Sequence, residues 1–367
     1  MVDTPARAQK QERRVEMVER ELMGALREVA VAAGIDLIGA TSAEALPVDE
    51  GDWWGHDQPR ELLPEARSVV VAGFSIRYEP RVVPSEPGKP RGRFTPGGSR
   101  VFQQMERHCW NVVGDFLAAH GYRAVAGDRL PIKPAIVRAG LGRYGKHCVV
   151  ITPELGSMVM WGAMATDAPL VDPEADRPIR AEICATDCRL CVDACPTGAI
   201  AGDFQLDRSK CITNWLWGAS AAPELRHHQA DRMFGCGECL LACPYSAPIP
   251  FRLAYPVLTD KVDDSPELLP LVAGDPDYYD RAMPTFPVRA GQDAMRCNAI
   301  IALANNGDPA GVPALAASIE SQNGQVRAYS AWALGRLGGP EARSVLERAA
   351  ERETDERVAA ELRAALR

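Results

Sequence analysis

Eight of the eleven cysteines lie in one stretch of the chain, between Cys184 and Cys243. Even spacing of eleven cysteines over 367 residues would put only about two in such a stretch. Thiolates are strong ligands for zinc and for iron–sulfur clusters. The cysteine distribution therefore predicts a metal-binding segment.

The spacing of these cysteines is similar to that of two-cluster ferredoxins. The first run is C-x3-C-x2-C-x3-C-P, the second is C-x2-C-x3-C-P, and one further cysteine lies between them. In the bacterial run C-x2-C-x2-C-x3-C-P, the cysteine before the proline ligates the other cluster. We therefore expect two [4Fe–4S] clusters, the first held by Cys184, Cys188, Cys191 and Cys243, and the second by Cys195, Cys211, Cys236 and Cys239.

Structural zinc and disulfides are the alternatives for these cysteines. Zinc sites rarely combine this spacing with a proline after the last cysteine, and thiols stay reduced in the cytoplasm. Two adjacent clusters would form a one-electron relay, which needs an acceptor, and we expect that acceptor in the N-terminal domain. Cys109, Cys148 and Cys297 fall outside the pattern and are predicted to be small buried hydrophobic residues.

The overall charge restricts the partners of the chain. The net charge of -8 argues against broad, non-specific binding of nucleic acid, although it permits a local basic patch. The uncharged stretches are far shorter than the ~20 residues of a membrane-spanning helix. The polar N-terminus carries no readable export signal. We expect a cytoplasmic protein that does not enter a membrane.

A glycine-rich turn follows a predicted helix over 132–138. Its glycines, Gly140, Gly142 and Gly145, match the dinucleotide-binding pattern G-x-G-x-x-G literally. That fingerprint must follow a strand and begin a helix, whereas this turn leads into a predicted strand over 148–152. We interpret the glycines as backbone that lets a large planar or phosphate-bearing ligand approach.

The elements that would position these residues predict a multidomain α+β protein. Residues 1–167 should form an α/β domain with helices over 15–33 and 99–120 and with strands over 37–41, 68–74, 123–125, 148–152 and 158–165. The proline-rich segment 79–98 is predicted to be a surface loop or lid without a regular element. Residues 168–255 should form a ferredoxin-like two-cluster domain, and residues 256–290 a linker or wrapping segment.

The C-terminal segment, residues 291–367, contains an internal repeat. The run MRCNAIIALANNGDPAGVPAL from Met295 aligns with VRAYSAWALGRLGGPEARSVL from Val326, at a period of 31 residues. Two helices per unit, separated by Gly and Pro, are typical of HEAT-like repeats. Two such units need a neighbouring domain to cover their apolar faces, so we expect a scaffold here and no catalysis.

Several runs together resemble the epoxyqueuosine reductase family over nearly the whole chain. They are AGLGRYGKHCVVITPELGS, CVDACPTGAI, CITNW, DRMFGCGECLLACP and the C-terminal repeat. The stretch PIKPAIVRAGLGRYGKH is also similar to reductive dehalogenases. The resemblance implies a base-off cobalamin in the N-terminal domain, reduced by a neighbouring cluster. It also implies reduction of epoxyqueuosine to queuosine in tRNA, with reduced ferredoxin or flavodoxin as electron donor.

The same resemblance suggests roles for individual residues. Asp128, which opens a D-x-x-P stretch, occupies the place of the family's proton donor, although Arg129 and Leu130 replace its usual small residues. Tyr144 is a second candidate acid, since dehalogenases use a tyrosine proton donor. Lys146 is expected on a cofactor phosphate or propionamide, and His147 stands where the family usually has asparagine.

Two other functions remain open on the sequence alone. The same machinery can act on a small molecule, as in reductive dehalogenases, or the chain can be a ferredoxin-like electron carrier without a corrinoid. Binding of tRNA would require clustered positive charge, yet residues 289–367 contain ten arginines, no lysines and ten acidic residues. Trp215 and Trp217, close to Cys211, either shield the second cluster from water or line a substrate pocket.

Overall fold

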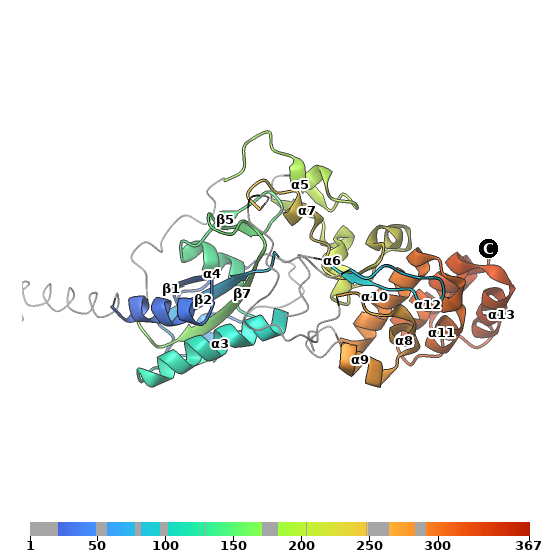
Figure 1. Ribbon diagram of the computed structural model, residues 1–367, viewed down its shortest axis with the longest axis horizontal. Helices are drawn as coiled ribbons and strands as arrows, with labels where there is room; N and C mark the ends of the chain where they lie inside the picture. The colour runs from blue at the N-terminus through green and yellow to red at the C-terminus, as the bar shows by residue number, and fades with distance from the viewer. Residues whose placement is uncertain are drawn as a thin grey trace, which may run out of the picture. The chain divides into compact units, whose positions relative to one another are not determined.

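The computed structural model describes residues 21–48, 57–77, 82–95, 102–127, 129–170, 183–202, 204–246, 248, 264–282 and 291–367 (Figure 1). The chain forms two compact units. One consists of Met1–Arg77, Gln104–Cys188 and Cys243–Pro250, and the other of Tyr78–Gln103, Arg189–Ala242 and Phe251–Arg367. The two units are defined by contacts between residues, whereas the predicted domain boundaries at 167, 255 and 290 were placed from sequence motifs. The predicted boundaries therefore stay predictions.

The first unit is built on a four-stranded sheet. Its strand order is β1-β2-β7-β4, and every neighbouring pair is antiparallel. The bounds are β1 Leu37–Ser42, β2 Ser68–Ser75, β4 Ala124–Ala126 and β7 Val159–Thr166. The short strands β5 (Arg143–Tyr144) and β6 (Val150–Ile151) pair separately as a hairpin. The predicted strands are confirmed, and the antiparallel pairing makes this unit an α+β structure.

Helices cover both faces of this sheet. Residues 21–32 are helical, as predicted; α2 spans Pro59–Leu62, α3 Phe102–Ala119 and α4 Ile132–Arg138. On one face α3 lies close to β7, because a Cβ at Gly162 would meet the Cβ of Cys109 at 3.0 Å. The neighbouring Trp161 packs with residues of α4 in a separate hydrophobic cluster. Successive strand residues point to opposite faces, so α3 and α4 lie on opposite sides of the sheet (Figure 1).

Short elements carry most of the cysteine segment. They are α5 (Leu190–Asp193), β8 (Ile200–Gly202), β9 (Gln205–Leu206), η1 (Arg208–Lys210), α6 (Ile212–Leu216), η2 (Pro223–Gln229), β10 (Arg232–Phe234) and α7 (Glu238–Leu241). Their brevity is what we expect of a region without periodic hydrophobicity.

The proline-rich segment 79–98 is more ordered than predicted. It contains β3 (Arg93–Phe94), which pairs in parallel with β10. The pairing is supported by a bond from the Arg93 backbone N–H to the Asp231 carbonyl, 2.9 Å. The prediction of no regular element was therefore wrong for these residues, because tertiary pairing outweighs local proline content.

The C-terminal helices confirm the HEAT-like repeat. They are α10 (Gly291–Asn306), α11 (Val312–Ser318), α12 (Gly324–Leu337), α13 (Gly339–Ala350) and α14 (Glu356–Ala365), with the short helix η3 (Pro309–Gly311) before α11. The equivalent residues Leu303 and Leu334 are fully buried, and the equivalent glycines Gly307 and Gly338 both have positive φ at a helix end. The segment 256–290, predicted to be a linker or wrapping segment, contains two short helices that the sequence analysis did not predict. They are α8 (Leu268–Ala273) and α9 (Pro276–Ala282).

A single hydrophobic core joins the second part of the cysteine segment to the repeat. Trp215 and Met233 are buried in the same cluster as Ile300 of α10. Buried polar contacts add to it: the Trp215 indole N–H donates to Gln229 Oε1 (3.1 Å), and the Asn298 amide donates to the Leu216 carbonyl (2.9 Å). The predicted cover for the repeat is thus supplied within the second unit.

Within the described residues, no helix combines the length and the apolar character needed to cross a membrane.

Candidate cluster and cofactor sites

Five of the cysteines interact electrostatically within the second unit. Burial raises the pKa of the Cys239 thiol, and the negative charges of Cys236, Cys211, Cys195 and Cys191 raise it further, Cys191 the least. Burial also raises the pKa of Cys211 and of Cys236, with neighbouring thiolates adding to both effects. Mutually repelling thiolates gain stability from a bound cationic centre. Cys195, Cys211, Cys236 and Cys239 were predicted for the second cluster, whereas Cys191 was predicted for the first.

Cys195 is surrounded by hydrogen-bond donors. Burial opposes its ionisation, yet bonds from the backbone N–H groups of Ile200, Thr197 and Ala199 outweigh burial, so its pKa lies below the ordinary value. The Ala199 N–H donates to the Cys195 sulfur at 3.2 Å. Hydrogen bonds to ligand sulfurs are a common means of tuning iron–sulfur clusters. The donor set around this thiolate fits a cluster ligand.

Three cysteines interact within the first unit. Burial raises the pKa of Cys243, and the charges of Cys184 and Cys188 add to the effect. The structure thus brings the last cysteine of the second run to the first two cysteines of the first run. Cys191, the fourth predicted ligand, lies in the second unit. Among the described residues, no three His, Cys, Asp or Glu side chains converge as the ligands of a single metal ion would.

The turn after Cys243 is tied to the sheet unit. Ser246 is fully buried, and its hydroxyl accepts a bond from the Ser157 backbone N–H at 3.0 Å. The Arg77 guanidinium donates to the Ser246 carbonyl. Gly156 has φ of +64°, and a Cβ there would lie 2.6 Å from the Tyr245 carbonyl oxygen. These anchoring residues were missed by the sequence analysis, since nothing in their spacing marks them.

The glycine-rich turn has structural reasons for its glycines. Gly140 has φ of +75° and ends α4, with Gly140 N–H donating to the Val137 carbonyl and Leu141 N–H to the Ile136 carbonyl. This is a Schellman motif. A Cβ at Gly142 would lie 2.6 Å from the Ile151 carbonyl oxygen, and one at Gly145 would contact the Ile151 side chain. The turn follows α4 and precedes β6, so the predicted order of elements is confirmed, and it is the reverse of the order in a dinucleotide fingerprint.

Lys146 lies against the first cysteine loop. Its ammonium donates to the Thr186 carbonyl at 2.7 Å and to the Cys188 carbonyl at 3.3 Å. The side chain is buried although it is charged. The structure therefore places this predicted cofactor ligand on the backbone that carries Cys184 and Cys188.

His147 is buried and neutral. Burial, together with the positive charge of Lys133, lowers the pKa of His147 to about 4. Its Nδ1 accepts a bond from the Val149 N–H (3.2 Å), so Nε2 carries the hydrogen. Nε2 has no partner among the described residues. The side chain is thus a fixed donor with unused hydrogen-bonding capacity.

The two candidate acids differ in what the structure shows. Tyr144 is half-buried, and its side chain packs against the hydrophobic cluster that includes Val150. Asp128 lies outside the described residues. Its neighbours on either side are described, and the Leu130 N–H donates to the Gly127 carbonyl at 3.2 Å.

The remaining cysteines and tryptophans mostly pack in the interior. Burial raises the pKa of Cys109 and of Cys297 to about 12, in agreement with buried, inert thiols. Cys148 departs from that prediction, because it is half-buried in a turn with φ of +61°. Trp215 is buried, and Trp217 makes an edge-to-face contact with Phe234. The shielding interpretation of the tryptophans fits this packing.

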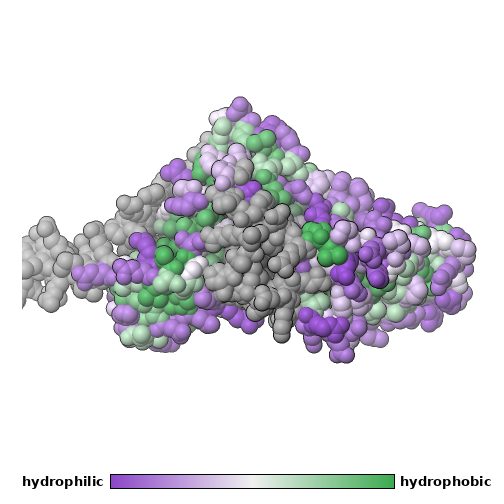
Figure 2. Space-filling view, in the orientation of Figure 1, coloured by the Kyte–Doolittle hydropathy of each residue, from purple (hydrophilic) through white to green (hydrophobic). Residues whose placement is uncertain are grey.

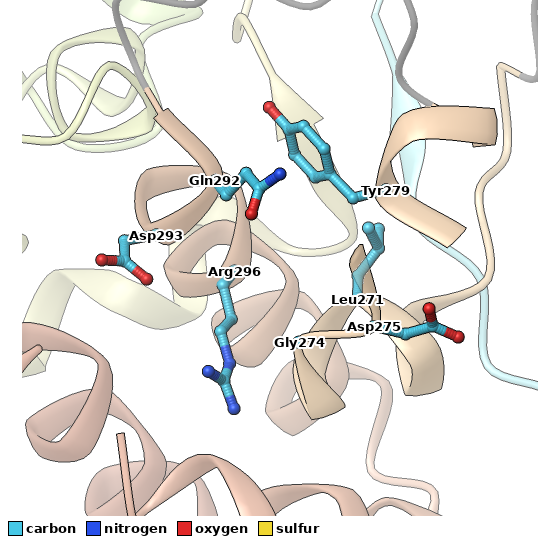
Figure 3. Close-up of a pocket in the computed structure, with 7 residues that line it drawn as sticks. All are labelled: Leu271, Gly274, Asp275, Tyr279, Gln292, Asp293 and Arg296. Atoms are coloured by element: carbon cyan, nitrogen blue, oxygen red, sulfur yellow. The ribbon is translucent and has the colours of Figure 1, made fainter. Parts of the chain in front are cut away.

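A small surface pocket lies beside α8, α9 and α10 (Figure 3). Its lining residues are Leu271, Gly274, Asp275, Tyr279, Gln292, Asp293 and Arg296. In the figure the Arg296 side chain extends away from Tyr279. Its guanidinium donates to the Val272 and Ala273 carbonyls (2.8 and 3.2 Å), at the end of α8. The arginine therefore caps the end of α8.

Family models match two parts of the chain. One, described as a 4Fe-4S double cluster binding domain, matches residues 184–246, and the other, described as HEAT repeats, matches residues 288–367. The first match covers the seven cysteines of the two runs and Cys211 between them, and the second covers the helical repeat.

Whole proteins match over most of their length. The chain is 34% identical to an epoxyqueuosine reductase of Bacillus anthracis over 86% of this chain and 84% of that protein. It is 29% identical to that of Bacillus subtilis over 93% and 94% of the two chains.

Solved structures agree with these matches. An epoxyqueuosine reductase with a tRNA-Tyr epoxyqueuosine-modified tRNA stem loop matches 96% of this chain and 98% of its own, with a TM-score of 0.79 and 27% identity. A structure of the Bacillus subtilis enzyme, with its catalytic aspartate loop swung out of the active site, has the same TM-score and identity. The cysteine groups, the helical repeat and the near full-length similarity agree, and the chain belongs to the epoxyqueuosine reductase family of oxidoreductases.

Proposed function

We propose that this chain reduces epoxyqueuosine in tRNA to queuosine, with two [4Fe–4S] clusters and a cobalamin. The observation that carries the proposal is the similarity over 96% of the chain to an epoxyqueuosine reductase solved with a modified tRNA stem loop. A match limited to the cysteine segment would support only an electron-transfer function. A match that includes the sheet unit, the cysteine segment and the repeat supports the whole reaction.

The cysteine groups supply the proposed cluster ligands. Cys195, Cys211, Cys236 and Cys239 would hold one cluster, and their mutual charge interactions support this set. Cys184, Cys188 and Cys243 would hold the other together with Cys191. In this assignment the last cysteine of each run ligates the cluster of the other run, as in two-cluster ferredoxins. Reduced ferredoxin or flavodoxin is the proposed electron donor.

The residues near the glycine turn fit a corrinoid through one group. Corrinoid side chains end in amides, whose oxygens accept hydrogen bonds. The buried His147 Nε2–H has no partner among the described residues and would gain one from such an oxygen. Satisfying a buried donor is worth about 1–3 kcal/mol. When bound, cobalamin supplies a low-potential cobalt centre for the removal of the substrate oxygen.

The overall reaction sets what the protein must deliver. Conversion of an epoxide to an alkene and water consumes two electrons and two protons. Each cluster passes one electron at a time, so the two reduced clusters together would hold the two electrons of one turnover. A side chain must protonate the departing oxygen, because an alkoxide is a poor leaving group.

Asp128 is the proposed proton donor. The sequence resemblance puts it at the place of the family's proton donor, and a solved relative has a catalytic aspartate loop. A carboxylic acid held in an apolar site can keep its proton near neutral pH and deliver it to a developing anion. Tyr144 is the alternative donor, although its packing against the Val150 cluster favours a structural role.

The test is conversion of a defined substrate. The reconstituted, reduced protein is incubated anaerobically with an epoxyqueuosine-containing stem loop, and nucleosides are analysed by mass spectrometry. We expect queuosine from wild type and from Tyr144→Phe, and at least a hundredfold slower conversion by Asp128→Asn with cofactors retained. Conversion of a halogenated phenol in place of the stem loop would instead support the small-molecule function.

A further inference from the structure

The charge and position of Lys146 suggest a function that the cofactor-binding interpretation does not include. The side chain is only 8% exposed. Removing an ammonium group from water is costly unless acceptors or negative charge compensate. The Thr186 and Cys188 carbonyls provide acceptors at 2.7 and 3.3 Å. Both belong to the loop that carries two proposed ligands of the first cluster.

The hairpin holds the lysine in this position. Gly145 N–H donates to the Val149 carbonyl at 2.9 Å, and Cys148 N–H donates to the Gly145 carbonyl at 2.9 Å. The lysine therefore sits in a tight turn between β5 and β6. Its backbone is fixed by the sheet unit, and its side chain fixes the cysteine loop within that same unit.

The charge has a further consequence for electron transfer. A thiolate-ligated [4Fe–4S] cluster is an anion, and it gains another negative charge on reduction. A buried positive charge beside the ligand loop stabilises the reduced state more than the oxidised state. The potential of that cluster is therefore raised relative to a cluster without such a neighbour.

We infer that Lys146 is a positioning residue that holds the Cys184–Cys188 loop and raises the reduction potential of the first cluster. This inference rests on the proposed cluster assignment. Its effect would favour the arrival of electrons at the cluster three of whose proposed ligands, Cys184, Cys188 and Cys243, share a unit with the sheet, the glycine turn and His147.

The test measures potentials and iron in the loaded protein. Lys146→Gln keeps hydrogen-bond donors without charge, Lys146→Met removes both, and Lys146→Arg keeps the charge. Lys210→Met is the matched control, because Lys210 precedes Cys211 of the other group but is half exposed and pairs with Asp207 at 3.1 Å. Midpoint potentials are read by electron paramagnetic resonance, and the first cluster is identified by the signal lost in Cys243→Ser.

For Lys146→Gln we expect the reduced-to-oxidised ratio at the wild-type midpoint to fall about tenfold, which corresponds to about 59 mV for one electron. Lys146→Arg and Lys210→Met should stay near wild type. Loss of first-cluster iron in Lys146→Met alone would support the positioning function.

Two results would overturn the inference: unchanged potentials with full iron in both uncharged variants, or an equal shift in Lys210→Met. A wild-type protein without any iron–sulfur signal would instead overturn the proposed function, so the two failures are distinguishable.

Discussion

The hydroxyl oxygens of Ser157 and Ser246 lie 2.9 Å apart, and both side chains are buried. Ser246 follows Cys243 in the second cysteine run, whereas Ser157 comes just before β7 of the sheet. The contact fixes a proposed first-cluster ligand to the sheet unit. The other ligands of its own run, Cys236 and Cys239, belong to the second unit.

Substitution of Gly156 tests this anchor. A Cβ there would lie 2.6 Å from the Tyr245 carbonyl oxygen and 2.7 Å from the Ser246 hydroxyl, so Gly156→Ala must displace the turn after Cys243. We expect iron content to fall to about half of the wild-type value, because one of two equal clusters is lost. Iron per chain and cluster absorbance measure the effect.

Gly88→Ala is the matched control for this experiment. Gly88 also has positive φ, +78°, but a Cβ there would meet nothing within 4 Å. Both substitutions incur the backbone cost of a positive φ, on the order of 1 kcal/mol, and only one creates a clash. Equal iron loss in the two variants would contradict the anchoring account.

The sequence predicted the chemistry better than the supporting contacts. Cysteine spacing predicted the double-cluster segment, because each ligand must occupy a fixed place in the motif, while the division of the ligands between the two clusters stays a prediction. The repeat was visible because the same buried positions recur, such as Leu303 and Leu334. By contrast, β3 depends on pairing with β10, which comes more than a hundred residues later, and no local pattern encodes it.

The glycine turn is another case in which the sequence did not reveal the structural role of its residues. Gly140, Gly142 and Gly145 were predicted to admit a ligand, but each has a local structural reason in the helix end or the hairpin. Nothing in the sequence indicated that Lys146 would reach a loop forty residues away. Long-range polar contacts of this kind depend on the fold and leave no periodic signal.

His147 should make stability sensitive to acid. Its pKa is about 4 in the folded chain, against an ordinary value of 6.5, so the unfolded chain binds more protons between these two pH values. Stability is full above pH 6.5 and is lost as pH falls, by on the order of 3 kcal/mol once below pH 4. Anaerobic thermal melts from pH 7.5 to 5.5 should show a steeper decline for wild type than for His147→Asn. Parallel declines would exclude this contribution.

Arg336 is the residue we expect to contact RNA in the repeat. The visible face of the C-terminal helices is largely hydrophilic (Figure 2). Much of the positive charge of residues 291–367 is compensated by ion pairs. Carboxylates of the same segment pair with Arg327, Arg343, Arg352, Arg357 and Arg363. The exposed Arg336 instead lies over the Trp332 ring, 5.9 Å from its centroid.

Arg336→Ala should therefore weaken binding of the stem loop and reduce the slope of log affinity against log salt by about one. Arg343→Ala is the control, since its guanidinium pairs with Glu347 at 3.0 Å. Fluorescence anisotropy at several salt concentrations measures both slopes. A larger change for Arg343→Ala would show that RNA binds elsewhere.

Arg226 should be critical for the stability of the second unit. It is 3% exposed, donates to Glu361 at 2.6 Å and lies 4.4 Å from the centroid of the Tyr329 ring. Arg226→Met leaves Glu361 without its partner and should cost roughly 3–5 kcal/mol. The double variant Arg226→Met/Glu361→Leu should recover much of this loss. The stabilities of wild type, the single variant and the double variant are compared by their inactivation half-lives at one temperature. If the double variant is no more stable than Arg226→Met, the loss comes from packing alone.

The most direct measurement is a single turnover with the fully loaded protein. The reduced wild-type protein, with cobalt and iron quantified in the same sample, is mixed anaerobically with one equivalent of the epoxyqueuosine stem loop. We expect queuosine to form as the clusters are oxidised, and we expect little in Cys243→Ser or in protein without cobalt. Equal queuosine formation in those two samples would contradict a reductase in which the paired clusters feed a cobalt centre.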